Sequence, residues 1–191
     1  MNLSRYPVAV LLLSSVAVAG AVGIQQPKTN PDAQLLQDFK ARVDKYMELH
    51  KRLEKESPPL KETKDPAKIK ASQEALAEKI RAARKDARQG DIFTPEIAQL
   101  FRRLLYPEVK GPEAKETKRV IKDDAPPPKA VPLKVNAEYP EGQPLPTVPA
   151  NLLAQLPKLP EDLEYRVVSD ALILRDVHAN LIVDFIPKAI R

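Results

Sequence analysis

Residues 163–186, which read LEYRVVSDALILRDVHANLIVDFI, decide the fold of this chain. Three short runs in this stretch are rich in Val, Ile and Leu, as is typical of β-strands. They cover residues 163–168, 171–175 and 180–186. The two connections between them have the length of hairpin turns, so the stretch predicts a three-stranded antiparallel β-meander.

The first turn, at Ser169 and Asp170, sets the register of the first hairpin. We expect the pairs Val167 with Leu172, Tyr165 with Leu174, and Glu164 with Arg175. Both faces of the sheet carry large apolar side chains. We expect Tyr165, Leu172, Leu174 and Ile182 on one face, and Val168, Ile173, Val183 and Phe185 on the other. A three-stranded sheet cannot bury two apolar faces by itself, so it needs helices, a second copy of the chain or another partner.

Three amphipathic helices are predicted before the sheet. The first begins at Pro31 and runs for about 25 residues. Its apolar stripe has helical spacing and consists of Leu36, Phe39, Val43, Tyr46, His50 and Leu53. The second runs from Pro66 to Gln89 and ends at Gly90, and the third follows the N-cap Thr94 and ends near Pro107. The first two helices predict an antiparallel helical hairpin, and residues 31–106 together form a helical module.

Proline dominates the sequence between the third helix and the sheet. Residues 107–160 contain 12 of the 20 Pro residues of the chain. Such a composition favours extended segments over a packed core, so we expect residues 107–148 to be a Pro-rich linker. Residues 149–191 then form a second module, a short helix followed by the β-meander. The expected fold class is therefore α+β.

Residues 1–21 have the order of a signal peptide. Arg5 precedes an apolar run, and small residues follow around Ala19. We expect cleavage near residue 21 and export, either to the periplasm or as a secreted protein, and the style of the sequence indicates a bacterial envelope. If residues 6–24 are retained instead, they are long enough to anchor the chain in a membrane. With the signal cleaved, we expect no stable membrane span.

Composition and motifs exclude several kinds of active site. None of the 191 residues is Cys, which excludes disulfides, thiolate metal sites and Cys nucleophiles. The sequence has no Gly-rich phosphate loop, no HExxH motif and no Ser in a Gly-x-Ser-x-Gly elbow. We therefore expect a non-enzymatic protein without a cofactor, which acts as an interaction or structural protein.

Four apolar side chains are candidate interaction residues. Phe101 and Leu104 belong to the third helix, and Tyr165 and Phe185 belong to the sheet. Large apolar side chains of this kind supply contact area when a surface is buried against a partner. The partner is an unknown protein, an envelope component or a second copy of the chain, which would give a homo-oligomer.

The second helix carries a basic stripe. Arg81, Arg84, Lys85 and Arg88 lie on its adjacent turns, in a chain of net charge +5. Such a stripe suits a solvated helix face, or a contact with an anionic surface of the envelope. We do not expect nucleic acid as a partner, because acidic residues are interspersed and stacking aromatic side chains are missing.

The chain contains two His residues. His50 belongs to the apolar stripe of the first helix, which favours a histidine at the edge of the core. His178 lies in a turn close to Asp176, and these two side chains could hold a metal ion together with a third ligand. We favour a solvated turn at His178. A periplasmic protein that binds a metal or a small ligand is the alternative function.

The run EYRVVSDALILRDVHANLIVDFI resembles the tail of small exported bacterial proteins of uncharacterised function. It is also similar to the terminal hairpin of periplasmic nickel/cobalt-homeostasis proteins of the RcnB type. The likeness covers 23 of the 191 residues and is a pattern of β alternation. It implies an exported protein with a C-terminal hairpin. We carry over no metal function from it, because the shared pattern contains no set of ligands.

Overall fold

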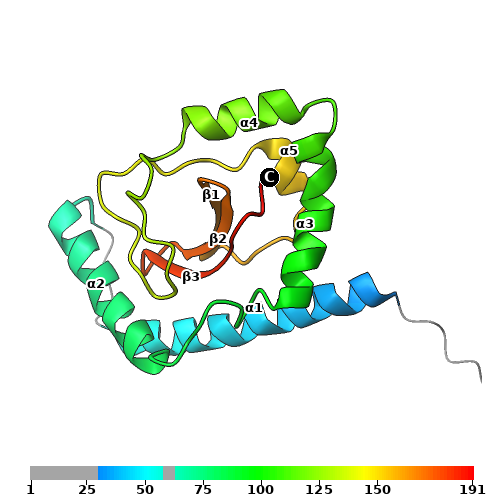
Figure 1. Ribbon diagram of the computed structural model, residues 1–191. Coiled ribbons are helices and arrows are strands. Elements are labelled where there is room, and N and C mark those ends of the chain that lie inside the picture. The colour runs from blue at the N-terminus through cyan, green and yellow to red at the C-terminus, as the bar shows by residue number, and fades with distance from the viewer. Residues whose placement is uncertain (1–29, 58–62) are drawn as a thin grey trace, which may run out of the picture.

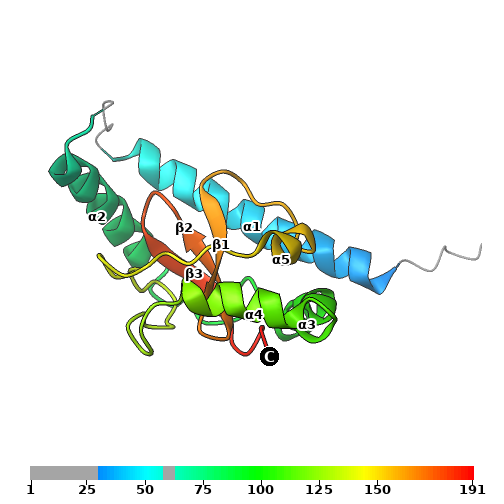
Figure 2. The same ribbon diagram turned by 90° about the horizontal axis from the view of Figure 1, so that it is seen from above.

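The computed structural model describes residues 30–57 and 63–191 and has a mixed α+β fold. Within these residues the helices are α1 (Pro31–Lys55), α2 (Pro66–Ala83), α3 (Pro95–Lys110), α4 (Ala114–Asp123) and α5 (Ala150–Ala154). The strands are β1 (Leu163–Val168), β2 (Ala171–Asp176) and β3 (Leu181–Ile186). In Figure 1 the helices α1 to α4 lie around the sheet. The view from above places α1 and α4 on different sides of the sheet (Figure 2).

The three strands form an antiparallel meander in the order β1-β2-β3, which confirms the predicted fold class. The first hairpin has the predicted register, since Val167 pairs with Leu172 and Glu164 pairs with Arg175. Ser169 in the turn adopts a positive φ of 56°, as a two-residue hairpin turn requires. The local turn sequence was therefore enough to fix this pairing.

The predicted division of the β3 side chains between the two faces was wrong. A register shift interrupts the β2–β3 ladder between Leu174 and Arg175. As a result, Val183 packs in the core on the helix side of the sheet, while Ile182 packs in the second core cluster on the opposite side. Bulges re-aim side chains in this way, because one extra residue inverts the alternation of faces.

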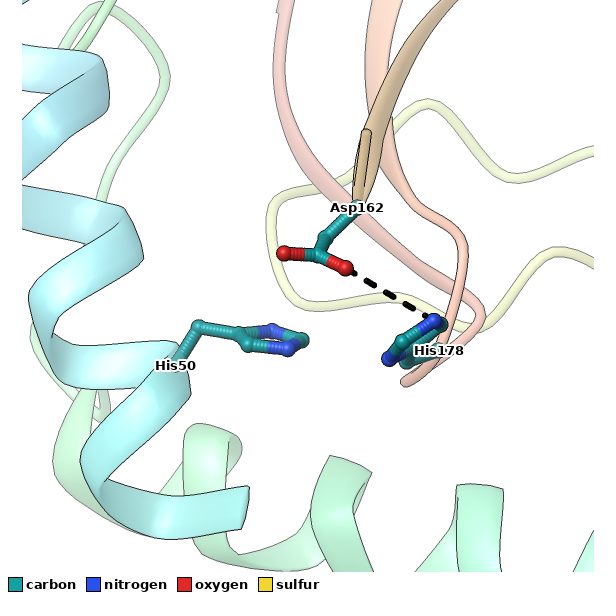
Figure 3. Close-up of side chains that lie close together, drawn as sticks. All are labelled: His50, Asp162 and His178. Carbon is teal, nitrogen blue, oxygen red and sulfur yellow. Dashed lines mark ion pairs between the residues drawn. The ribbon is translucent and has the colours of Figure 1, made fainter. Parts of the chain in front are cut away.

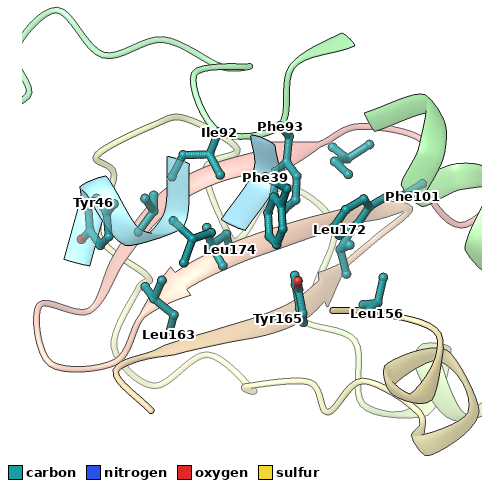
Figure 4. Packing of buried hydrophobic residues seen from close by; sticks show 14 of the residues in the cluster. Phe39, Tyr46, Ile92, Phe93, Phe101, Leu156, Leu163, Tyr165, Leu172 and Leu174 are labelled. Atoms are coloured by element: carbon teal, nitrogen blue, oxygen red, sulfur yellow. The ribbon is translucent and has the colours of Figure 1, made fainter. Parts of the chain in front are cut away.

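Helix α1 supplies one wall of the main core. Asn30 caps it, since its side-chain oxygen accepts a hydrogen bond from the backbone N–H of Asp32 at 3.0 Å. The predicted stripe is buried from Phe39 onward. Phe39 stacks on Phe93 with ring centroids 5.6 Å apart and meets Phe101 edge-on at 5.0 Å (Figure 4). These aromatic contacts join α1, the α2–α3 connection and α3, and Phe101 in turn meets Tyr165 of β1 at 6.2 Å between ring centroids.

Helix α2 is shorter than predicted and ends at Ala83 rather than Gln89. The segment after α2 folds against the buried carboxylate of Asp184 in β3 and supplies its hydrogen-bond donors. The backbone N–H groups of Gly90, Ile92 and Phe93 donate to Asp184 over 2.8–3.0 Å. Gly90 reaches this position with a φ of 94°, a conformation that glycine adopts without strain.

The predicted linker is largely folded. Helix α3 continues through Pro107 to Lys110, and α4 follows at residues 114–123, a stretch that contains no proline. Residues 131–139 then run beside β3, where the backbone N–H of Asn136 donates to the carbonyl of Ile182 at 2.8 Å. Pro107 lies inside the last turn of α3, and the other prolines of this region lie outside α3 and α4.

Residues 131–139 cover the second apolar face of the sheet. Val131, Val135 and Tyr139 are buried there, against side chains that include Ile173 and Phe185. The helices cover the other face, so both apolar faces of the meander are buried within one chain.

The predicted signal peptide and the alternative anchor at residues 6–24 lie outside the described residues. No helix of the described part is long and apolar enough to cross a membrane.

Candidate metal centre

The side chain of His50 is fully buried near the C-terminal end of α1. Its Nδ1 lies 2.6 Å from Oδ2 of Asp176, the last residue of β2. A carboxylate oxygen only accepts hydrogen bonds, so Nδ1 carries a hydrogen, and in the neutral form of His50 the lone pair is on Nε2. Nε2 is buried and has no hydrogen-bond partner within residues 30–57 and 63–191. A buried polar atom without a partner is costly, and this atom therefore needs an explanation.

Asp176 holds three groups in place at once. Its Oδ2 also accepts a hydrogen bond from the hydroxyl of Tyr46 at 2.6 Å, and its Oδ1 accepts one from the backbone N–H of Ala179 at 2.7 Å. Tyr46 precedes His50 by one helical turn, and Ala179 follows His178 directly. One buried carboxylate thus fixes the ring of His50 and the turn that carries His178.

Electrostatics favour the charged form of this pair. Burial opposes the imidazolium of His50, but the hydrogen bond and negative charge of Asp176, with smaller contributions from Glu54 and Asp162, raise its pKa above the usual value. Burial likewise opposes the carboxylate of Asp176, yet the contacts with His50, Ala179 and Tyr46 hold its pKa below the usual value. The pKa of Tyr46 is raised by burial and by Asp176, so its hydroxyl remains a donor.

Three further side chains gather beside the free Nε2 of His50. Figure 3 shows the rings of His50 and His178 and the carboxylate of Asp162 pointing toward one another. One ligand atom from each of these residues lies within 4.8 Å of the others. His178 Nε2 is 3.6 Å from Asp162 Oδ1, and His178 Nδ1 is 3.0 Å from Glu54 Oε1. Glu54 Oε2 is in turn 3.7 Å from His50 Nε2.

This geometry is close to what a transition-metal ion needs. Imidazole and carboxylate ligands bind Zn²⁺ at about 2.0–2.2 Å, which puts the ligand atoms of a tetrahedral site about 3.4 Å apart. The three ligand atoms lie within 4.8 Å of one another, so they must approach by at most about 1.4 Å to reach that spacing. The hydrogen bond from Nδ1 of His50 to Asp176 is the support that metal-bound histidines almost always have.

One side of the cluster faces solvent. The side chains of His178 and Glu54 are 49% and 47% exposed, while His50 is fully enclosed. Glu54 stands one turn after His50 on α1, so it can approach an ion held by the two imidazoles. An ion could therefore enter without unfolding of the chain, and a position for water or a further ligand would remain open.

His50 and His178, which the sequence analysis considered separately, lie beside each other in the structure. His50 was predicted at the edge of the core and is buried, and its ring centroid lies 5.7 Å from that of His178. Asp176 was considered as a ligand, and it is fully buried behind His50 with both its oxygens in use. Glu54 was missed, although the i, i+4 spacing from His50 could have indicated it. No sequence pattern indicated Asp162 as a ligand, because the other residues of the cluster lie far from it in the sequence.

The predicted interaction residues contact the chain's own core. Phe101, Tyr165 and Phe185 are buried, with exposed fractions between 0% and 9%. Phe101 packs edge-on against Tyr165 at 6.2 Å between ring centroids. Leu104 alone among the four is partly exposed.

Two residues of the predicted basic stripe have partners inside the chain. Arg84 donates to the carbonyl of Val183 and to the side chain of Asn136, each at 3.1 Å, and lies 5.0 Å from the ring centre of Tyr46. Arg81 donates to the carbonyl of Asn136 at 3.2 Å. Lys85 and Arg88 are exposed.

Comparisons with known proteins give no match. No protein-family model matches the sequence, and no curated protein or solved structure is significantly similar to the chain.

Proposed function

We propose that this chain is an exported protein that binds one divalent transition-metal ion through His50, His178 and Asp162, with Glu54 beside the open side of the ion. The observation that carries the proposal is the buried Nε2 of His50, which has no hydrogen-bond partner among the described residues, in a side chain that clusters with His178 and Asp162. A metal ion would supply the missing partner.

The ligand types favour a particular group of metals. Two imidazoles and a carboxylate suit Zn²⁺ and its neighbours among the divalent transition metals, whereas Ca²⁺ and Mg²⁺ prefer sites made of oxygen alone. Without Cys, the chain offers no thiolate to a soft ion such as Cu(I). We take Zn²⁺ as the reference ion for experiments.

Binding requires the exchange of protons for the metal. Nδ1 of His178 lies 3.0 Å from Oε1 of Glu54, and its Nε2 lies 3.6 Å from Oδ1 of Asp162. The ligating nitrogen of each imidazole must be free of a proton when the metal binds, and the ion then gives both carboxylates a cationic partner.

Export and a binding role without turnover are part of the same proposal. Residues 1–21 have the charge and hydropathy order of a signal peptide, and a chain without Cys needs no pairing in an oxidising compartment. The partner predicted from the sequence, a protein or an envelope component, stays a prediction. The burial of Phe101, Tyr165 and Phe185 removes these side chains from any surface that such a partner could contact.

A thermal-shift titration with Zn²⁺ tests the proposal. At a free concentration one hundred times the dissociation constant, an ion that binds only the folded state adds about 2.7 kcal/mol of stability. For a chain of this size this raises Tm by about 5–10 °C. The shift should disappear in His178→Ala and shrink in Glu54→Gln. Glu48→Gln is the matched control, because Glu48 is an exposed carboxylate on the same helix. An equal shift in His178→Ala and in the unmodified protein would refute the site.

A further inference from the structure

A cavity lies on α1, closer to the N-terminal end of the helix than the metal ligands. It has a volume of about 710 Å³ and is bounded by residues 36–44 of α1 and by residues 155–160, which lead into β1. Leu104 of α3 also lines it. Nothing in the metal centre uses this space, and none of the proposed metal ligands lines it.

The wall of this cavity is mainly apolar. Phe39, Val43 and Leu156 are buried side chains of the main core, and they present part of their surface to the cavity. Leu36 and Leu159 are partly exposed and line it as well. An apolar space of several hundred cubic ångströms with few polar groups is the usual form of a small-molecule site.

The charged groups of the cavity leave a net positive charge. Its lining contains two lysines, Lys40 and Lys158, and one acidic residue, Asp44. Lys40 Nζ pairs with Asp44 Oδ2 at 2.5 Å, so these two charges neutralise each other. Lys158 is exposed and forms no ion pair with any residue in the part of the chain that the structure describes.

We propose that this cavity binds a single-chain anionic amphiphile of the fatty-acid class, with its hydrocarbon chain on the apolar wall and its carboxylate at Lys158. The apolar wall of the cavity favours binding of the hydrocarbon chain of the ligand, and the positive charge of Lys158 favours a negatively charged head group. This site is separate from the metal centre and does not depend on it.

A single extended alkyl chain suits the form of this cavity, which follows residues 36–44 of α1 on one side and residues 155–160 on the other. Its volume of about 710 Å³ is in the usual range of small-molecule sites.

Isothermal titration calorimetry with monomeric octanoate, decanoate and dodecanoate tests the apolar part of the proposal. Each added methylene should tighten binding by about fourfold, because it buries further apolar surface. Dodecyltrimethylammonium has a chain of the same length and the opposite charge, and it should bind at least about fivefold more weakly. Failure to saturate with any of the carboxylates, or no dependence on chain length, would overturn the proposal. Equal binding of the cationic amphiphile would overturn the assigned head group.

Variants locate the site. Lys158→Glu should weaken dodecanoate binding about fivefold, while Lys118→Glu, at an exposed lysine of α4, should leave it unchanged. Leu104→Gln should weaken it about tenfold. Leu104 is partly exposed, and circular dichroism checks that this variant folds. His178→Ala should bind dodecanoate normally, which separates this site from the metal centre. Unchanged binding in both Lys158→Glu and Leu104→Gln would place the amphiphile elsewhere and refute the assignment.

Discussion

Nδ1 of His50 lies 2.6 Å from Oδ2 of Asp176, although 126 positions separate the two residues in the sequence. Both side chains are fully buried. A buried charge pair of this kind contributes little net stability, because desolvation of the two groups offsets most of their attraction. Its consequence is geometric: it fixes the imidazole ring of His50 in the cluster with His178 and Asp162. We interpret Asp176 as the residue that positions the proposed ligands.

Replacement of Asp176 should therefore weaken metal binding, although Asp176 is not itself a ligand in our assignment. We expect Asp176→Asn to lower the affinity for Zn²⁺ by about 10- to 100-fold, as the loss of a supporting partner of a metal-bound histidine does elsewhere. Competition with a chromogenic zinc chelator measures this affinity. If Asp176→Asn bound Zn²⁺ as tightly as the unmodified protein, the positioning role would be wrong.

Tyr46 supplies a smaller part of the same support. Tyr46→Phe removes the hydroxyl that donates to Asp176 at 2.6 Å and leaves that carboxylate oxygen with His50 alone. The free energy of unfolding should fall by about 1–2 kcal/mol, which urea denaturation measures. The zinc affinity should fall less than in Asp176→Asn, because the contact between His50 and Asp176 is kept. A larger loss of affinity in Tyr46→Phe would reverse the assigned order of importance.

Stability should depend on pH in opposite ways with and without metal. The raised pKa of His50 means that its contribution to stability is complete below about pH 6.5 and is lost as the pH rises through the folded-state pKa. The lowered pKa of Asp176 gives a contribution that is present above about pH 3.9 and is lost as the pH falls through the folded-state value. The metal-free protein should thus be most stable between these two values.

Zinc should change the upper part of this profile. Its ligands must lose their protons, so zinc affinity rises with pH over the range in which the metal-free protein loses stability. Urea midpoints at about pH 6 and about pH 9, with zinc and with a chelator, measure both effects. The metal-free decrease should be absent in His50→Gln. A metal-free protein that became more stable across this range would contradict the assigned direction of the His50 pKa.

Asp184 provides a test of the fold that leaves the metal centre intact. Its buried carboxylate accepts hydrogen bonds from the backbone of Gly90, Ile92 and Phe93, and also of Phe185. In Asp184→Asn the amide N–H₂ would face these donors, so the free energy of unfolding should fall by about 2–3 kcal/mol. Zinc affinity, measured where the variant is folded, should be unchanged. A variant as stable as the unmodified protein would remove Asp184 from its proposed role as the anchor of the α2–α3 connection.

Short-range patterns predicted the elements of this fold. The turn at Ser169 and Asp170 fixed the first hairpin, and the spacing from Phe39 to Leu53 fixed the buried face of α1. Features that depend on distant partners were not predictable in this way. The early end of α2 depends on Asp184, about ninety residues further along the chain. Helix α4 was missed because overall proline content hid a stretch of ten residues without proline.

The candidate site shows the same limit. His50 and His178 were both recognised as the available imidazoles, but their proximity results from packing of α1 against the β2–β3 turn. The spacing of His50 within an apolar stripe correctly indicated burial. It could not reveal that Nε2 has no partner, because that depends on Asp176 occupying the opposite nitrogen. Asp162 joins the cluster only through the sheet that begins beside it.

X-ray absorption at the zinc edge of the purified, zinc-loaded protein tests the central claim most directly. We predict a first shell of nitrogen and oxygen at about 2.0–2.1 Å, with the outer-shell scattering of two imidazole rings. His178→Ala should retain no zinc after desalting, in agreement with the expected loss of its thermal shift. In the unmodified protein, a shell of oxygen ligands without imidazole scattering, or a zinc content that desalting reduces to zero, would contradict the assignment of His50 and His178 as metal ligands.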